Sequence, residues 1–418
     1  MAVKIEEQSS KIVKPLVSTL PTLRHYKLGF IEEVVAFVNV GVVLFFTPSS
    51  EHNAKFVSQL EKSLKRTLTQ FYPLAGRYVQ ESHIIECNDE GVEFICAKVN
   101  TTLQDFLSYK ENDKIIDDFI PCNEFLLATQ VTMFECGAVA IGVSATHMLC
   151  DASTLCTFIN EWGVMNRGES QTEFTGAGFS SSSLYQTRGL CPIPKMSSDM
   201  LTKFTRKKVS ISESVISQIK AKGKNSTRKW SKVQLVAAIF WKAFIDIDRK
   251  IYNYQRESVL IQSINLRGKM ASLIPKDSCG NIFGMFATEA GVAETTEALT
   301  DLLSDSVRKT VTNYSKAYHN NEEGETMVFN SFSQLLNINP ESTNAVILTS
   351  WCKFPFYEAD FGFGKPIWAA PGTIPVKNSA YFMDYAEGNG VESYVFLETK
   401  DVPFFEEAFY RVINDFAV

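Results

Sequence analysis

The feature that most limits the possible folds is a stretch rich in glycine, serine and proline between residues 176 and 198, which shows neither a helical nor a strand period. Such a composition is typical of loops and linkers. The chain has 418 residues, and a single hydrophobic core usually stops growing below this length. The sequence therefore predicts two domains, one on each side of this stretch. The expected bounds are 1–178 for the N-terminal domain, 179–200 for a crossover linker and 201–418 for the C-terminal domain.

Both halves mix helical and strand patterns, which predicts the α/β fold class. Apolar residues recur at helical spacing in the segments 54–69, 153–165, 214–222 and 231–246. Short apolar runs predict strands, among them 34–46, 207–212, 259–265, 345–351 and 394–397. Two pairs of runs, 84–87 with 92–99 and 125–134 with 138–145, are expected to form β-hairpins. The polar segment 322–326 is expected to be a surface loop.

Charge and cysteine content narrow the range of partners. The 41 basic and 47 acidic residues are mixed along the chain and give a formal net charge of -6, so a broad cationic field for nucleic acid is not expected. Nine cysteines are scattered without a Cys-x-x-Cys pair, which indicates reduced thiols in a cytoplasmic setting and no metal site. The apolar run 34–46 is too short for a membrane helix, which needs about 20 residues. We therefore expect a cytoplasmic protein without a nucleic-acid or membrane partner.

Only five histidines are available for acid–base chemistry, and His147 has the most informative position. It lies at the end of the apolar run 139–145 and four residues before Asp151, where a helix is expected to begin. Imidazole titrates near pH 6.5, so a histidine held at a strand end can take a proton from an alcohol or amine. The plainer interpretation is that His147 closes the strand and Asp151 caps the helix. The four-residue spacing by itself favours this plainer interpretation, because it often occurs by chance.

A resemblance along the rest of the chain changes this balance. The segments His147-Met148-Leu149-Cys150-Asp151 and Asp360-Phe361-Gly362-Phe363-Gly364 resemble the paired His-x-x-x-Asp and Asp-Phe-Gly-Trp-Gly signatures of the plant BAHD acyltransferases. Further matching segments follow in order at 71–77, 234–238, 265–267, 280–281, 349–351 and 383–384. The segments 134–137 and 142–143 are most similar to the subgroup of vinorine synthase and other alkaloid acetyltransferases, to which acylsugar-forming members are related. The resemblance covers essentially the whole chain.

The resemblance implies a fold of two chloramphenicol-acetyltransferase-like domains with mixed sheets and an interdomain channel. It also implies a monomeric enzyme that uses acyl-CoA as a co-substrate and holds no permanently bound cofactor. In this family the acceptor attacks the thioester directly in a ternary complex, so His147 would be the general base. Holding both reactants beside one base removes an entropic barrier of several kcal/mol.

The same resemblance gives Asp151 an indirect catalytic role. Its counterpart in the family points away from the reacting centre and pairs with an arginine, for which Arg267 is the best match here. Such a pair would orient the turn that carries His147. Ala152 stands where the family has a glycine after the aspartate.

The second signature is expected to give structural support. Two glycines, Gly362 and Gly364, permit a turn closed to other residues, and Asp360 would hold that turn. Phe363 replaces the tryptophan of the family pattern. Its ring is expected at the acceptor channel, where it can pack but cannot donate an indole N–H bond.

The sequence also offers candidates for the CoA contacts and the substrates. Ser231, Ser263 and Asn265 are candidates for contacts with CoA, although a cap or strand role explains each of them equally well. Acetyl is the favoured acyl group, because the segment 278–282 does not match the Tyr-Phe-Gly-Asn-Cys block of flavonoid-glycoside malonyltransferases. The expected acceptor is a hydroxyl or amine of a plant specialised metabolite such as an alkaloid. The alternative is a malonyl or short branched acyl donor acting on an acceptor such as a sugar ester.

Other functions fit the sequence less well. A hydrolase with Cys150 or a serine as nucleophile would need an elbow motif, and the segment 142–146 lacks its final glycine. A catalytically silent metabolite-binding relative would be expected to have lost the motif histidine, which is intact. Condensation domains of peptide synthetases typically carry a second histidine at the position of Thr146.

Overall fold

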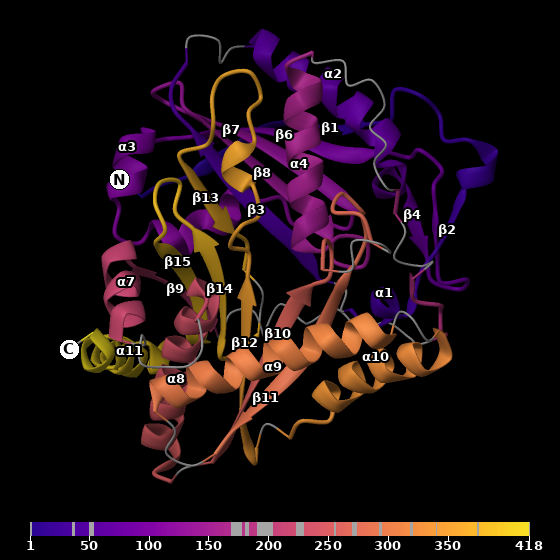
Figure 1. The fold of residues 1–418 in the computed structure, drawn as a ribbon. Coiled ribbons are helices and arrows are strands. Elements are labelled where there is room, and N and C mark those ends of the chain that lie inside the picture. Colours follow the sequence, from indigo (N-terminus) through magenta and orange to yellow (C-terminus); the bar gives the residue numbers. More distant parts are fainter. Residues whose placement is uncertain are drawn as a thin grey trace. The chain divides into compact units, whose positions relative to one another are not determined.

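The computed structural model describes residues 2–35, 38–49, 54–168, 178–179, 184–189, 204–222, 230–254, 256–269, 274–291, 295–317, 321–339, 341–373 and 376–417. Backbone contacts group the chain into two compact units (Figure 1). Unit 1 comprises Met1–Met196, Pro275–Ile282 and Phe354–Ile374, and unit 2 comprises Ser197–Ile274, Phe283–Lys353 and Pro375–Val418. Two segments expected in the C-terminal domain therefore pack with unit 1. Most of the expected linker, 179–200, lies outside the described residues.

Unit 1 is built on a six-stranded mixed sheet. In spatial order its strands are β1 (Ile5–Val13), β6 (Val92–Val99), β7 (Leu127–Phe134), β8 (Val139–Thr146), β3 (Asn39–Phe46) and β13 (Trp368–Pro371). The pair β6 and β7 is parallel, and the other neighbouring pairs are antiparallel. Strand β8 is buried along its whole length, which is typical of a central strand covered on both faces.

Smaller elements surround this sheet. A three-stranded sheet joins β2 (His25–Lys27), β5 (Ile84–Glu86) and β4 (Arg77–Val79). The helices of unit 1 are η1 (Pro21–Leu23), α1 (Phe30–Val34), α2 (Ala54–Gln70), η2 (Tyr72–Ala75), α3 (Leu103–Ser108), η3 (Asn112–Phe119), α4 (Ala152–Asn166) and η5 (Phe356–Glu358). Helices α2 and α4 pack together, and the indole N–H of Trp162 donates to the Leu60 carbonyl at 3.1 Å.

The first expected hairpin is wrong, and the second is confirmed. Strand β5 pairs with β2 and β4, whereas β6 pairs with β1 and β7, so the runs 84–87 and 92–99 belong to different sheets. Strand β5 forms a hairpin with β4, which comes just before it, while β6 pairs with the more distant β1 and β7. An apolar run does not reveal which strand it will pair with. Strands β7 and β8 form the second hairpin as expected.

Unit 2 is built on a second six-stranded mixed sheet. In spatial order its strands are β11 (Phe283–Ala290), β10 (Glu257–Asn265), β12 (Thr343–Ser350), β14 (Ser379–Asp384), β15 (Val391–Glu398) and β9 (Phe204–Ile211). Strands β10, β12 and β14 run parallel, so their carboxyl ends meet at one edge. The helices are α7 (Glu213–Lys222), α8 (Lys232–Tyr252), α9 (Thr296–Ala317), α10 (Asn321–Leu336), η6 (Thr399–Asp401) and α11 (Val402–Ala417).

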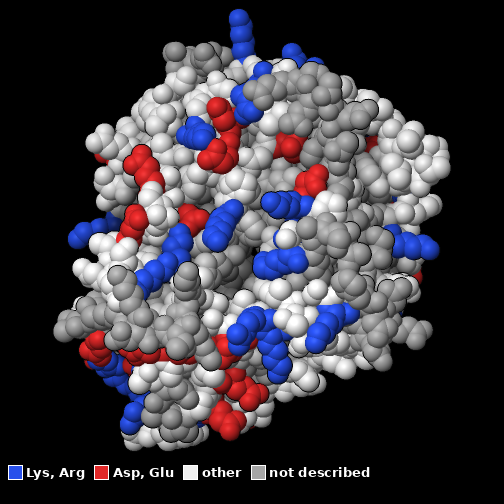
Figure 2. Space-filling view, viewed as in Figure 1, with Lys and Arg blue, Asp and Glu red and all other residues white. Residues whose placement is uncertain are grey.

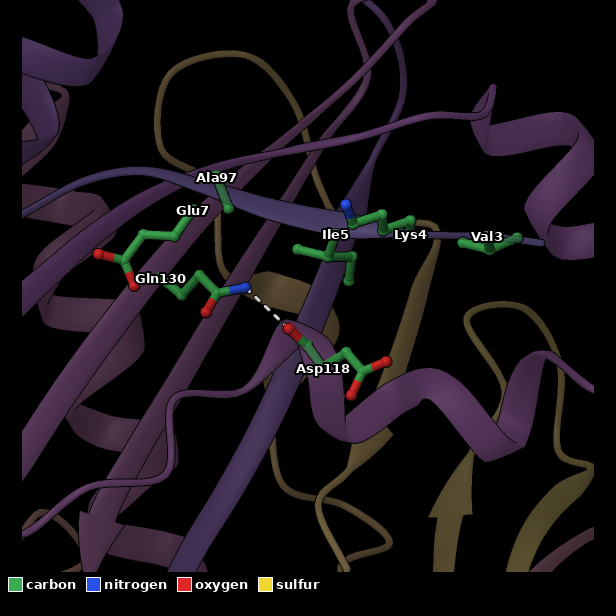
Figure 3. A pocket seen from close by; sticks show the side chains of 7 residues that line it. All are labelled: Val3, Lys4, Ile5, Glu7, Ala97, Asp118 and Gln130. Carbon is green, nitrogen blue, oxygen red and sulfur yellow. Dashed lines mark hydrogen bonds between the residues drawn. The ribbon is translucent and has the colours of Figure 1, made fainter. Parts of the chain in front are cut away.

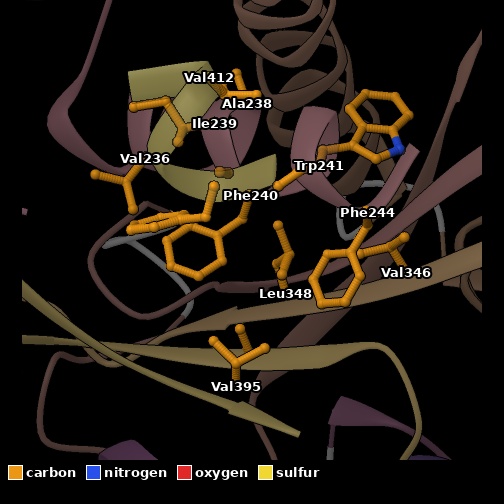
Figure 4. Close-up of a cluster of buried hydrophobic side chains, with 14 of the residues drawn as sticks. Val236, Ala238, Ile239, Phe240, Trp241, Phe244, Val346, Leu348, Val395 and Val412 are labelled. Atoms are coloured by element: carbon orange, nitrogen blue, oxygen red, sulfur yellow. The ribbon is translucent and has the colours of Figure 1, made fainter. Parts of the chain in front are cut away.

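Helix α8 is the centre of the unit 2 core. It contacts α9, α11 and β12, and Figure 4 shows its apolar side chains above Leu348 of β12 and Val395 of β15. The segment 322–326 lies in α10, so the expected loop is wrong. Its polar residues form the first turns of a helix whose buried residues, Val328 and Phe332, come later. Both units thus confirm the predicted α/β class with mixed sheets. Within the described ranges, no helix is long and apolar enough to cross a membrane.

Candidate active site

His147 lies in a tight turn between β8 and α4 of unit 1. Strand β8 ends at Thr146, and Asp151 is the N-cap of α4. The backbone N–H of His147 donates to the Val38 carbonyl at 2.8 Å, and that of Cys150 donates to the Thr146 carbonyl at 3.0 Å. The backbone around His147 is therefore bonded to the residue before β3 and closed by a bond across the turn.

The environment of the imidazole favours its neutral form. His147 is half-buried, and its Nδ1 atom is shielded from solvent. Burial lowers the pKa of His147, while hydrogen bonding to its own backbone, the charge of Asp151 and the amide of Asn281 act in the opposite direction. A histidine that is neutral near pH 7 can accept a proton, as a general base must.

Asp151 fulfils the capping interpretation and also binds a second segment. Its Oδ1 accepts from the backbone N–H of Thr154 at 2.8 Å, and its Oδ2 accepts from that of Ile282 at 3.1 Å. Arg267 follows β10 in unit 2, where its backbone N–H donates to Asn265 Oδ1 at 3.0 Å. The pairing of Asp151 with Arg267 stays a prediction.

A segment without an assigned role in the sequence analysis completes this turn. The side-chain Nδ2 of Asn281 donates to the carbonyls of His147 at 2.7 Å and Met148 at 3.0 Å. The neighbouring Gly280 exchanges two bonds with the Thr154 hydroxyl, at 3.0 Å through its N–H and 2.9 Å through its carbonyl. The one sequence signal for this segment was the match of Gly280-Asn281 to the BAHD pattern.

The loop Asp360–Gly364 lies at the other end of α4. Asp360 Oδ1 accepts from the N–H groups of Gly362 at 2.7 Å and Gly364 at 3.1 Å. Both glycines have a positive φ, +99° and +102°, which other residues rarely adopt. The side chain of Arg167, which caps the C-terminal end of α4, donates to the Asp360 carbonyl.

This loop lies far from His147 along α4. A Cβ at Gly163 would lie 2.6 Å from the Asp360 carbonyl oxygen, so the loop contacts α4 closely at this position. Gly163 is twelve residues beyond Asp151, and at 1.5 Å per residue this corresponds to about 18 Å along the helix. The arrangement fits the structural support expected of Asp360, Gly362 and Gly364, because the loop is too far away to contact reacting atoms at His147.

Phe363, a residue of this loop, packs against two aromatic rings outside it. Its ring lies 4.9 Å from those of Phe46 and Phe56, both nearly perpendicular to it. Phe46 pairs with Val139 at the start of β8, whereas Asn39 pairs with Thr146 at its end. Phe363 therefore lies at the sheet edge opposite His147, and these contacts give no support to a place in the acceptor channel.

The candidates for CoA contacts all lie in unit 2. Ser231 caps α8, where its hydroxyl accepts from the N–H of Gln234 at 3.2 Å. Ser263 and Asn265 lie near the carboxyl end of β10. An ion pair between Lys232 and Asp384 joins the start of α8 to the end of β14, so these candidates share one edge of the sheet. Their cap and strand roles are observed, and contacts with CoA stay a prediction.

A cavity of about 430 Å³ opens elsewhere in unit 1 (Figure 3). Lys4, just before β1, and Glu7 of β1 line it. Asp118 and Gln130 line it as well, and Gln130 Nε2 donates to the Asp118 carbonyl at 2.9 Å. Burial and the nearby charge of Asp117 raise the pKa of Asp118. Gln130 pairs with Gly142, five residues before His147, which corresponds to about 17 Å along a strand. This cavity is therefore separate from the histidine turn.

Charge is mixed on the surface. On the face shown in Figure 2, lysine and arginine side chains lie among acidic ones. This distribution agrees with the near balance of 41 basic and 47 acidic residues in the sequence. Among the residues placed in the structure, no group of three or more His, Cys, Asp or Glu side chains could hold a metal ion.

The fold matches that of a plant enzyme of known structure. The crystal structure of vinorine synthase superposes with a TM-score of 0.85 at 27% sequence identity, covering 99% of this chain and 100% of that one. This match confirms the predicted fold class of two chloramphenicol-acetyltransferase-like domains with mixed sheets.

The sequence comparisons give the family. A family model described as Transferase family matches residues 3–412, and the chain belongs to this family, that of the plant BAHD acyltransferases. Vinorine synthase of Rauvolfia serpentina is 30% identical over 94% of each chain. Pelargonidin 3-O-(6-caffeoylglucoside) 5-O-(6-O-malonylglucoside) 4'''-malonyltransferase of Salvia splendens is 30% identical over 96% of this chain and 97% of its own. Stemmadenine O-acetyltransferase of Catharanthus roseus is 29% identical over 99% of each. The chain is thus an enzyme of the acyltransferase class, as predicted.

Proposed function

We propose that this enzyme transfers an acyl group, with acetyl favoured, from acyl-CoA to a hydroxyl or amine of a plant specialised metabolite such as an alkaloid. The observation that carries the proposal is the position of His147, a histidine with a lowered pKa on a rigid turn between β8 and α4. Membership in an acyltransferase family supplies the reaction class, and the turn supplies a base for it.

In the proposed mechanism the ring nitrogen Nε2 of His147 takes the proton of the acceptor O–H or N–H. The acceptor atom attacks the thioester carbonyl and forms a tetrahedral intermediate in a ternary complex. Collapse of the intermediate breaks the carbon–sulfur bond and expels the CoA thiolate, which recovers the proton from the imidazolium. Asp151 would act indirectly, because it holds the turn through Thr154 and Ile282.

The choice of acyl donor follows from the subgroup pattern in the sequence. Two relatives at similar identity carry names that refer to acetyl and to malonyl transfer, respectively. The alkaloid-type subgroup pattern at 134–137 and 142–143 favours acetyl and an alkaloid-like acceptor. A malonyl or short branched acyl donor with an acceptor such as a sugar ester is the second candidate.

Direct transfer requires no cysteine nucleophile. Cys150 is fully buried in the histidine turn. Purified protein would be incubated with acetyl-, malonyl- and isobutyryl-CoA and a plant metabolite extract, and thiol release and acylated products would be measured. We expect acetyl-CoA to give the highest rate and Cys150→Ala to remain active.

The decisive variant is His147→Ala. Loss of the general base should lower turnover by about 10²- to 10⁴-fold, while the melting temperature stays near that of the wild type. Near-normal turnover of His147→Ala, or an acyl thioester on Cys150 in the intact-protein mass spectrum, would contradict this mechanism.

A further inference from the structure

Asn281 is a buried residue whose side chain binds the histidine turn directly. Its side chain is fully buried, although it lies in a connection between two strands. The two Nδ2 bonds reach consecutive carbonyls, at 2.7 Å on His147 and 3.0 Å on Met148. An amide has two N–H donors, and a carboxylate has none, so this contact needs asparagine rather than aspartate.

The segment around Asn281 is held firmly enough to act as a fixed support. Gly280 is bonded to Thr154 through both its N–H and its carbonyl. The N–H of Ile282 donates to Asp151 at 3.1 Å, and Cys279 forms an isolated bridge with Phe179. All of these residues belong to unit 1. The segment Cys279–Ile282 thus binds both the turn and the first residues of α4.

The His147 carbonyl that Asn281 binds also bears on which nitrogen of the imidazole ring carries the proton. Its own backbone and the side chain of Asn281 both act to raise the pKa of His147, and Nδ1 is the ring nitrogen on the side of that backbone. The Nδ1 atom and the Oδ1 atom of Asn281 are both buried. A proton held on Nδ1 leaves Nε2 unprotonated, and Nε2 is then the nitrogen that can act as a base.

We propose that Asn281 is the positioning residue of His147: its amide holds the carbonyls of His147 and Met148 so that the imidazole keeps its proton on Nδ1 and presents Nε2. The inference rests on the proposed function, which makes His147 the base. It assigns to Asn281 an action through His147 and no contact with substrate.

The test compares Asn281→Leu with Asn344→Leu. Leucine has nearly the shape of asparagine but no donor. Asn344 is a matched control in unit 2, because it is 2% exposed and its Nδ2 donates to the Phe244 carbonyl at 3.4 Å and to Ser258 Oγ at 3.2 Å. Both variants lose a buried amide, but only Asn281 contacts the histidine turn.

The first measurement is ¹⁵N NMR of the histidine rings in the full chain at pH 7.5. His147 is one of five histidines, and its signals are identified as those absent from His147→Ala. We expect a single Nδ1–H tautomer in the wild type and in Asn344→Leu, and a mixture of tautomers in Asn281→Leu. An unchanged His147 tautomer in Asn281→Leu would overturn the proposal.

The second measurement is CoA release at saturating acetyl-CoA, with the plant extract as the source of acceptor. Turnover of Asn281→Leu should fall by about 10²-fold, the loss that a misplacement of about 1 Å can cause, while the KM for acetyl-CoA stays within about twofold. Equal turnover of the two leucine variants would overturn the proposal. If Asn281→Leu does not fold, Asn281→Ser replaces it, because a single short donor cannot reach both carbonyls. The tautomer of His147 and the turnover are then measured in that variant, with the same outcomes supporting or overturning the proposal. An active His147→Ala would reject the proposed function, whereas the NMR result would still decide the role of Asn281.

Discussion

Replacement of Asp360 by alanine is expected to destabilise the protein without impairing its chemistry. Asp360 Oδ1 accepts two backbone N–H bonds, from Gly362 at 2.7 Å and Gly364 at 3.1 Å. Each such bond contributes about 1 kcal/mol net. Since the loop is partly exposed, we expect the free energy of unfolding to fall by about 2 kcal/mol in total. In a unit of this size that corresponds to a melting temperature about 4–8 °C lower.

Turnover per folded molecule should be almost unchanged in the same variant. The loop contacts α4 near Gly163, about 18 Å along the helix from Asp151, and sites this far apart usually act independently. The assay combines thermal unfolding with turnover below the melting transition. Asp360→Asn is the control, because its side-chain oxygen can still accept both bonds and should restore most of the stability. A large loss of turnover with an unchanged melting temperature would refute this structural role.

Two further predictions concern the histidine turn. Because burial lowers the pKa of His147, the acidic limb of the pH–rate profile should lie below pH 6.5, the ordinary value for histidine; a limb above that value would contradict a buried neutral base. The unfolded histidine binds a proton near pH 6.5 before the folded one does, so His147 should destabilise the fold progressively as the pH falls below this value, and His147→Ala should reduce that loss in melting experiments. If Asp151 and Arg267 form a buried pair, Asp151→Asn and Arg267→Gln should each cost about 3–5 kcal/mol of stability, and the double variant should lose less than the sum. Strict additivity of their unfolding free energies would mean that the two residues do not interact.

Local patterns predicted the elements whose contacts are local. Helix α2, helix α4 and the hairpin of β7 and β8 lie within a few residues of their expected bounds, since each is specified by its own apolar spacing or by a short turn. The expected pairing of β5 with β6 was wrong because apolar spacing indicates a strand but not its partner. Strand β5 pairs with β4 just before it, and β6 pairs with β1 and β7. Likewise, the segments 275–282 and 354–374 pack with unit 1. This packing depends on contacts between distant parts of the chain, which the composition along the sequence does not reveal.

Helix α4 connects the two signatures, because each of them binds one of its ends. At its first residue, Asp151 caps the helix and binds the N–H of Ile282. At its last residues, Asn166 and Arg167 donate to the carbonyls of Phe361 and Asp360. The motif that looked catalytic and the motif that looked structural therefore hold opposite ends of one rigid helix. Sequence reasoning could name both motifs but could not relate them, because the relation is a distance along α4. Asn281 stayed without a role for the same reason, since its importance lies in two carbonyl groups more than 130 residues earlier in the chain.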